Sequence, residues 1–208
     1  MTVLAGAFDP PTRAHLTLAH AVLRAGAGAF LFSLAVRTID KEASAAAGVA
    51  PRLDMLGALA ARRRHVGVVV CNRGLYVDQA QALGDLGFRR PRFAIGIDKV
   101  PQLFDARYYR HRDAALRRLF ELASFLMVPR GGAGAEELAR FMALPAQRDY
   151  LGVIEMLRLT AREEQAMRDV SSTHVRALLA QHGKWQPLVP REIWNLVQRS
   201  GAYQGVLD

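Results

Sequence analysis

Short apolar runs alternate with amphipathic stretches along this chain, and that alternation limits its fold more than any other feature. The runs are Val3–Ala5, Phe30–Val36, Val66–Cys71, Arg92–Ile97 and Phe125–Val128, and a further strand is expected within Leu151–Leu159. Strands that alternate with helices predict a parallel sheet covered by helices on both faces. We therefore predict an α/β fold with a doubly wound parallel sheet. It forms a single domain over residues 1–208, and its helical C-terminal portion covers about residues 171–208.

Length and composition agree with such a domain. The chain has 208 residues, of which 51% are apolar, so it can bury a sizeable core. No apolar run approaches the roughly 18 residues of a membrane span, and the first strand follows Met1 too closely for a signal peptide. The single Cys71 excludes an intramolecular disulfide and suits a reducing compartment. We expect a cytoplasmic protein without a membrane partner, and homo-oligomerisation stays open.

The chain is basic, with a formal net charge of +9, and Arg supplies most of the positive charge because Lys occurs only at positions 41, 99 and 184. Such a chain can bind nucleic acid, or it can steer small anions such as nucleotides into a cleft. The Arg residues are scattered, and the sequence has neither zinc-finger spacing nor a basic–aromatic strip. We therefore favour small anions and expect no nucleic-acid partner.

A motif near the start, Gly6-Ala7-Phe8-Asp9-Pro10-Pro11-Thr12-Arg13-Ala14-His15, joins the first apolar run to a helical pattern. Gly6 and Ala7 are small, so their backbone can approach a ligand closely. Thr12 and His15 are three residues apart and share one face of the first helical turn. Free backbone N–H groups and the helix dipole attract an anion there. The motif predicts a phosphate-binding loop, and the simpler alternative is an N-cap Thr with a half-buried His.

A second motif, Ser171-Ser172-Thr173, stands before a helical stripe near the end of the chain. An N-cap explains one of these hydroxyls, whereas three in a row with free N–H groups also form a phosphate cradle. Arg176 lies one turn into the helix, where its guanidinium can reach a terminal phosphate with paired hydrogen bonds. Two such loops, far apart in sequence, indicate a site that binds a polyphosphate from both sides.

Together these motifs resemble those of the nicotinate/nicotinamide mononucleotide adenylyltransferases, a family of the nucleotidyltransferase superfamily. Three further stretches are similar to the family's pattern. Phe93–Asp98 resembles its strand that ends in Gly-x-Asp, and Val128–Arg130 resembles its strand-end Val-x-Arg. Leu188–Tyr203 resembles its closing helix. The resemblance implies a Rossmann-like sheet of the nucleotidyltransferase type. It also implies an enzyme of NAD biosynthesis that joins ATP to nicotinate or nicotinamide mononucleotide and releases pyrophosphate.

The resemblance further implies roles for individual residues. Thr12, His15 and Arg176 are the expected catalytic residues, and the carboxylate of Asp98 is expected to face the ribose of ATP. The expected ATP-binding residues are Gly6, Ala7, Phe8, Gly96, Asp98, Ser171, Ser172, Thr173 and Arg176. Mg²⁺ is expected to accompany ATP without dedicated protein ligands, because it retains waters and binds substrate oxygens.

The acceptor site departs from the family's pattern. The Trp that usually follows the Gly-x-Asp strand is replaced by Arg107-Tyr108-Tyr109, so a tyrosine is expected to stack on the acceptor's ring. The expected acceptor-binding residues are Lys41, Arg52, Tyr76, Tyr108, Tyr109 and Arg130, with Arg52 opening a helix Arg52–Ala61. Two alternatives remain. One is a related transferase that uses CTP or another phosphorylated acceptor, such as phosphopantetheine, and the other is a nucleotide-binding protein without catalysis.

Overall fold

The computed structural model describes residues 1–36, 45–129, 134–150 and 152–203, and its strands form one parallel sheet. The strands are β1 (Thr2–Gly6), β2 (Phe30–Ala35), β3 (Val66–Cys71), β4 (Arg92–Gly96), β5 (Ser124–Val128) and β6 (Ile154–Met156). Each predicted run forms a strand, and β6 is the strand expected within Leu151–Leu159. Their order, β3-β2-β1-β4-β5-β6, is that of doubly wound dinucleotide-binding folds. The predicted α/β class is confirmed, and the arrangement is consistent with a Rossmann-like fold.

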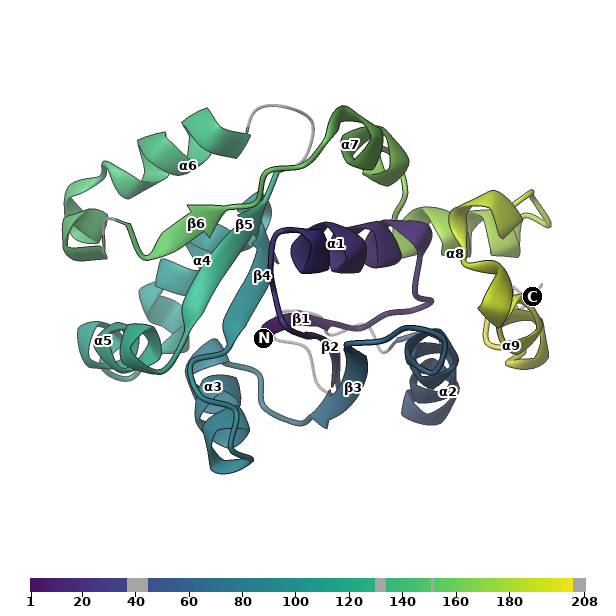
Figure 1. The fold of residues 1–208 in the computed structure, drawn as a ribbon, viewed down its shortest axis with the longest axis horizontal. Helices are drawn as coiled ribbons and strands as arrows, with labels where there is room; N and C mark the ends of the chain where they lie inside the picture. The colour runs from purple at the N-terminus through teal and green to yellow at the C-terminus, as the bar shows by residue number, and fades with distance from the viewer. Residues whose placement is uncertain (37–44, 130–133, 151, 204–208) are drawn as a thin grey trace.

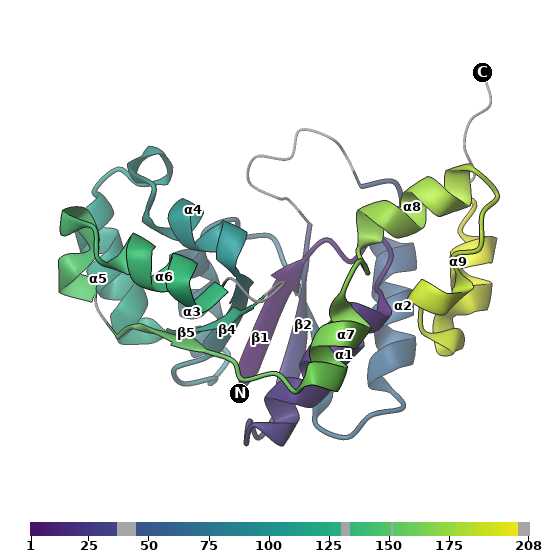
Figure 2. The ribbon, with the colours of Figure 1, turned by 90° about the horizontal axis from the view of Figure 1, so that it is seen from above.

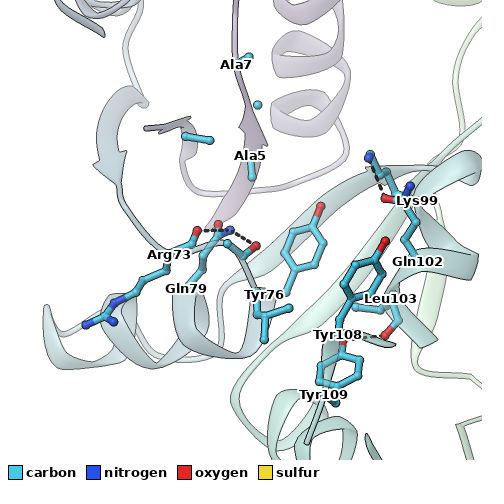
Figure 3. A pocket seen from close by; sticks show the side chains of 14 residues that line it. Ala5, Ala7, Arg73, Tyr76, Gln79, Lys99, Gln102, Leu103, Tyr108 and Tyr109 are labelled. Carbon is cyan, nitrogen blue, oxygen red and sulfur yellow. Dashed lines mark hydrogen bonds between the residues drawn. The ribbon is translucent and has the colours of Figure 1, made fainter. Parts of the chain in front are cut away.

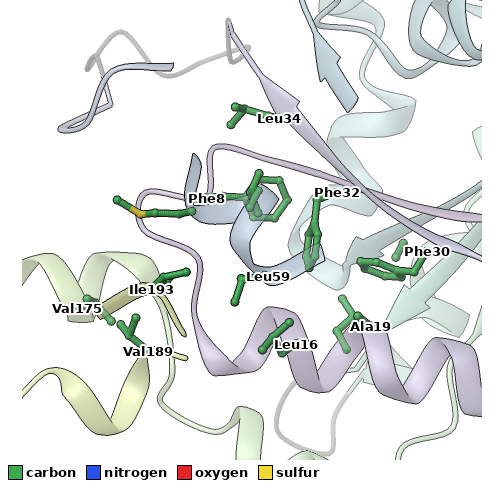
Figure 4. Close-up of a cluster of buried hydrophobic side chains, with 14 of the residues drawn as sticks. Phe8, Leu16, Ala19, Phe30, Phe32, Leu34, Leu59, Val175, Val189 and Ile193 are labelled. Carbon is green, nitrogen blue, oxygen red and sulfur yellow. The ribbon is translucent and has the colours of Figure 1, made fainter. Parts of the chain in front are cut away.

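Helices cover both faces of this sheet (Figure 1). They are α1 (Arg13–Arg24), α2 (Val49–Ala60), α3 (Tyr76–Asp85), α4 (Val100–Phe104), α5 (Arg112–Leu122), α6 (Gly134–Met142), α7 (Ala161–Met167), α8 (Ser172–Ala180) and α9 (Trp194–Arg199). Successive strand residues point to opposite faces, which gives two buried clusters. One joins Phe30 and Phe32 to α1, α2, α8 and α9 (Figure 4). The other joins Phe93 and Phe125 to α3, α4 and α5. Among the described residues, no helix is long and apolar enough to cross a membrane.

The ends of the first two helices follow from local sequence. Thr12 is the N-cap of α1, and Gly26 follows the helix with a φ of 95°, a left-handed conformation that glycine adopts readily. α2 begins at Val49, so the expected helix start at Arg52 is wrong. The intervening Pro51 lies in the first helical turn, where its missing N–H costs no helical hydrogen bond, and the helix therefore extends back past it.

The C-terminal helices belong to the same layer as α2. Val175 of α8, Val197 of α9 and the intervening Val189 and Ile193 are buried in the cluster that also contains Leu59 of α2 (Figure 4). This packing places α8 and α9 beside α2 at one end of the molecule (Figures 1 and 2). As a consequence, the N-terminus of α8 comes close to the loop that follows β1.

The strand order reverses at β1, because β2 and β3 lie on one side of it and β4 to β6 on the other. β1 and β4 are paired from Thr2 and Arg92, and they end at Gly6 and Gly96. In open parallel sheets, ligands bind beyond the carboxyl ends of the strands at such a switch point. We therefore expect a ligand site at the loops that follow Gly6 and Gly96.

Candidate active site

The two predicted phosphate-binding motifs meet at the carboxyl edge of the sheet. In Figure 2, β1 ends between α4 and α8. The Ser172 hydroxyl donates a hydrogen bond to the carbonyl of Pro10 at 2.8 Å. Nη1 of Arg176 donates to the carbonyl of Asp9 at 2.7 Å. Residues from opposite ends of the chain thus form one continuous surface.

A cavity of about 340 Å³ opens on this surface, and we call it the motif cavity. Its lining includes the predicted residues Gly6, Ala7, Phe8, His15, Gly96, Ser171, Ser172, Thr173 and Arg176. Thr12 and Asp98, which were also predicted to bind or act on ATP, are not in its lining. Thr12 is fully buried beneath the cavity, whereas Asp98 is exposed just past the end of β4.

His15 is held in one orientation by the residue that caps its helix. The backbone N–H of Thr12 donates to Nδ1 of His15 at 2.9 Å, and the Thr12 hydroxyl lies 3.0 Å from the same nitrogen. Because Nδ1 accepts a hydrogen bond, the ring proton of the neutral imidazole lies on Nε2. The edge of the ring also packs against Phe8, with centroids 5.1 Å apart. Thr12 is therefore placed to orient His15, and Nε2 is the nitrogen that carries a proton.

Arg176 is anchored on one side and accessible on the other. Besides the bond to Asp9, its Nη2 lies 3.3 Å from the hydroxyl of Thr173. Its side chain is 35% exposed, and it lines the motif cavity. Ser171 is the N-cap of α8, and its hydroxyl accepts from the backbone N–H of His174. The cap therefore uses one of the three hydroxyls, and Thr173 remains in the cavity lining beside Arg176.

Asp9 is a buried carboxylate to which the sequence analysis assigned no role. It accepts hydrogen bonds from the backbone N–H groups of Ala46 and Ala47 and from the hydroxyl of Tyr203, at 2.7, 3.1 and 2.8 Å. Burial, and then the charge of Asp9, raises the pKa of Tyr203 well above its usual value, so this hydroxyl remains a donor. Asp9 thus ties the first motif to the residues before α2 and to the C-terminal segment. Its position inside the motif was the only sequence signal.

Gly96 allows Asp98 to fold back over the end of β4. A Cβ at position 96 would lie 2.5 Å from Oδ1 of Asp98, closer than real Cβ contacts. A larger residue at 96 would displace this carboxylate. The Gly-x-Asp spacing therefore has a local steric reason, whatever the carboxylate binds.

A second cavity, of about 180 Å³, adjoins the first, and we call it the tyrosine cavity. The two cavities share Ala5, Gly6 and Ala7 at the end of β1. The tyrosine cavity is also lined by the three predicted acceptor-binding residues Tyr76, Tyr108 and Tyr109 (Figure 3). The tyrosines proposed for one ligand and the motifs proposed for the other therefore lie on opposite sides of the same strand end.

The three tyrosines differ in what they can offer a ligand. The ring of Tyr76 packs edge-on against Phe93 and Phe125, with centroids 5.1 and 5.5 Å apart. Burial, followed by the charge of Asp98, raises the pKa of Tyr76 to about 12. The Tyr109 hydroxyl donates to the carbonyl of Leu103 at 2.7 Å, and burial raises its pKa to about 12 as well.

Tyr108 lies in the short 3₁₀ helix Ala106–Tyr108, under the guanidinium of Arg107 at 5.6 Å from its ring centre. This helix is on the surface side of the cavity, whereas the Tyr76 ring is packed into the core. Tyr108 is therefore the ring that can meet an acceptor with the least rearrangement.

The remaining predicted acceptor residues lie elsewhere. Arg52 is only 4% exposed and donates hydrogen bonds to the carbonyls of Gly48 and Ala7 at 3.1 and 2.8 Å. It therefore holds the first motif in place and lines neither cavity. Lys41 and Arg130 lie outside the described residues.

Two cations at the tyrosine cavity were missed, Arg73 and Lys99. Lys99 directly follows the Gly-x-Asp stretch, and its amino group donates to the side chain of Gln102 at 2.8 Å. Arg73 follows the end of β3 in the same way. Their positions just after strand ends could have identified both, since parallel strands end at the same edge of the sheet.

The candidate site is defined by the geometry of its residues. Among the described residues, no group of three or more His, Cys, Asp or Glu side chains is placed to hold a metal ion. In comparisons with known proteins, no family model and no curated protein matches this chain. The case for a function therefore rests on the geometry of the two cavities and on the motifs that line them.

Proposed function

We propose that this protein is an adenylyltransferase that joins ATP to nicotinate or nicotinamide mononucleotide and releases pyrophosphate, on a sheet of the nucleotidyltransferase type. One observation carries the proposal: both end motifs line one cavity, three tyrosines line the next, and the two cavities share the end of β1. A group-transfer enzyme with two substrates needs two adjoining sites of this kind. The proposal places the reaction in the cytoplasm as a step of NAD biosynthesis.

In the proposed reaction, a phosphate oxygen of the acceptor attacks the α-phosphorus of ATP. The bond from that phosphorus to the oxygen bridging to the β-phosphate breaks, and pyrophosphate leaves with the electron pair. No covalent bond to the protein is needed, so positioning and charge stabilisation supply the rate. In this scheme ATP lies in the motif cavity and the pyridine ring in the tyrosine cavity, with the reacting atoms near Gly6 and Ala7.

Hydrogen-bond donors and cations of the protein are proposed to stabilise the negative charge that develops on the phosphate oxygens. Nε2 of His15 donates to an α- or β-phosphate oxygen, and Thr12 acts on the reaction by fixing the His15 ring. Thr173, Arg176 and the free N–H groups of α8 bind the β- and γ-phosphates. Asp98 is proposed to meet the ribose. His15 and Arg176 are then catalytic residues, and Thr12 and Asp9 are positioning residues.

Mg²⁺ fits this site only as a companion of ATP. Asp9, a carboxylate in the lining of the motif cavity, already accepts three hydrogen bonds and is buried. We propose that the ion is held by phosphate oxygens and waters, where it neutralises the phosphates.

A pyrophosphate-release assay tests the proposal. The protein is given ATP and Mg²⁺ with nicotinate mononucleotide, nicotinamide mononucleotide or phosphopantetheine in turn, and CTP replaces ATP in a parallel set. We expect release that depends on a pyridine mononucleotide and on ATP. Turnover with phosphopantetheine alone would leave the phosphate-binding roles intact and reassign the tyrosine cavity.

Binding without turnover is the other rival, a nucleotide-binding protein. Isothermal titration of ATP with and without each acceptor separates it from an enzyme. ATP binding that no acceptor converts to pyrophosphate release would support the binding protein and contradict the proposed reaction.

A further inference from the structure

A third pocket, of about 620 Å³, lies at the opposite edge of the sheet, where the strands begin. Its walls are the starts of β1, β4 and β5, the end of α1, and β6 with the two residues that follow it. Sites for small molecules typically enclose a few hundred to about 1,000 Å³. We call it the arginine pocket, because Arg24, Arg90, Arg92 and Arg158 line it.

Polar side chains stand at the first residues of the inner strands here. β4 and β5 have a strand on each side, and inner strands of a parallel sheet are normally apolar on both faces. Phe93 and Ile95 point into the cluster formed with α3 to α5, so Arg92 lies on the other face, in the lining of the pocket. Ser124, which pairs with Arg92, also lines the pocket. Arg92 is the first residue of β4 and its side chain is 40% exposed, so a ligand in the pocket can reach it.

Positive charge exceeds negative charge in this lining, since the described residues contribute four arginines and one carboxylate, Glu155. Arg24 is bound to Glu163 of α7 at 3.0 and 2.7 Å. Arg92 lies 3.4 Å from Glu155, a long contact between side chains that are 40% and 61% exposed. Within the described ranges, the guanidinium groups of Arg90 and Arg158 make no hydrogen bond or ion pair. This excess of positive charge favours the binding of an anion.

The backbone at Arg90 adds an independent observation. Its φ is 45°, in the left-handed region that glycine or asparagine adopts at lower cost. Arg90 combines this backbone conformation with an exposed side chain and a place in the pocket lining. Strain of this kind concentrates at functional sites.

We propose that the arginine pocket binds a phosphorylated small molecule, with Arg90, Arg92 and Arg158 as its phosphate ligands. Guanidinium groups bind phosphate oxygens in pairs, which suits several arginines around one concave space. The pocket is recessed, so it fits a compact anion better than a nucleic-acid duplex. This site lies at the other end of β1 and β4 from the candidate active site, and the inference does not depend on the proposed reaction.

Isothermal titration with inorganic tripolyphosphate tests the site. The full chain carries Arg176→Ala throughout, to weaken binding in the motif cavity. Arg90→Gln with Arg158→Gln is compared with a control, Arg64→Gln with Arg199→Gln. All four arginines are exposed, and the control pair lines none of the three cavities while removing the same charge. We expect the pocket variant to weaken binding roughly tenfold or more, the effect of losing charged hydrogen bonds, and the control to change it little.

Equal weakening by both variants would mean that tripolyphosphate follows net charge, and it would overturn the proposal. So would the lack of any binding to the Arg176→Ala protein. A single-stranded oligonucleotide is titrated in parallel. If it binds in a way that needs Arg90 and Arg158 while tripolyphosphate does not bind, the partner is a nucleic acid and the small-molecule site is rejected.

Discussion

At the scale of single residues, His15 shows how a local contact sets a chemical state. A helix N-cap normally uses its own side chain to accept a backbone N–H. Here the N-cap Thr12 also supplies a backbone N–H to Nδ1 of His15, so the imidazole is both oriented and left with its proton on Nε2. Orientation before the substrate arrives removes a reorganisation cost from the reaction.

We predict that His15→Ala lowers kcat by roughly 10²–10³, the usual effect of removing one donor that stabilises developing charge. The Kd of ATP should change much less, because the other contacts to the phosphates remain. Thr12→Val is the matched comparison: it keeps the backbone N–H bond to Nδ1 and should cost less. Turnover of His15→Ala at the wild-type rate would remove His15 from the site.

Arg176→Ala should weaken ATP binding by about 1.5–3 kcal/mol, the range for a hydrogen bond to a charged group. AMP should lose less affinity, since it lacks the distal phosphates that Arg176 is proposed to bind. Titration of both ligands checks this. If ATP and AMP weaken equally, Arg176 serves only to hold the Asp9 loop.

For the acceptor, Tyr108→Ala should raise the KM for the mononucleotide by about two- to tenfold, since an aromatic contact contributes about 0.5–1.5 kcal/mol beyond burial. Tyr108→Phe retains the ring and should leave KM nearly unchanged. ATP affinity serves as the internal control. An increase in KM with Tyr76→Ala instead would move the stacking role into the core-packed ring.

At the scale of elements, the loop after β1 is held by neighbours far away in sequence. Arg52 of α2 binds the carbonyl of Ala7, and Ser172 and Arg176 of α8 bind those of Pro10 and Asp9. A second long-range contact, between Arg24 of α1 and Glu163 of α7, ties the first helix to the segment before α8. The contacts of Ser172, Arg176 and Glu163 together fix where α8 can start.

The Arg24–Glu163 contact predicts a pH dependence. Hydrogen bonding from Arg24 is the main cause that lowers the pKa of Glu163 from 4.5 to about 2. A carboxyl whose pKa is lower in the folded state stabilises the fold above its unfolded pKa. That contribution is lost as the pH falls from about 4.5 to about 2.

Glu163→Gln keeps the polar group at the third position of α7, which suits the capping box, but removes the charge. Because Arg24 is half exposed, we expect a loss of only about 0.5–1 kcal/mol near neutral pH, shrinking as the pH is lowered. Urea unfolding of both proteins at several pH values measures it. A difference that does not depend on pH would show that the charge contributes nothing.

At the scale of the whole molecule, the two ends of the chain converge on one carboxylate. Asp9 binds Tyr203, and the N-terminus of α8 contacts Pro10. A ligand in the motif cavity must therefore hold both ends at once. Ligand binding at about 100 times Kd stabilises a fold by about 2.7 kcal/mol.

We predict that ATP slows amide hydrogen exchange in residues 6–15 and 171–176 together, with little change around the strand starts at the arginine pocket. Exchange measured with and without ATP, by mass spectrometry of peptides, reports both segments in one experiment. Slower exchange in only one of the two segments would contradict a ligand that binds both motifs.

Local sequence patterns were enough to predict the α/β class and the positions of the two motifs. Apolar runs that alternate with helical stretches favour a parallel sheet covered by helices, and the sheet has that form. Ser171 to Arg176 could be assigned to a helix start from its hydroxyls and the stripe that follows. These features depend on neighbours within a few residues, which the sequence contains directly.

Which side chains line the same cavity depends on how the helices pack against the sheet. Arg52 was expected to bind the acceptor, but the packing of α2 buries it against the Ala7 carbonyl. Asp9 became a central contact only because the segment before α2 and Tyr203 arrive beside it. The arginine pocket is likewise assembled from segments that are distant along the chain. Such contacts depend on how whole elements pack, and no local pattern of residue types specifies that.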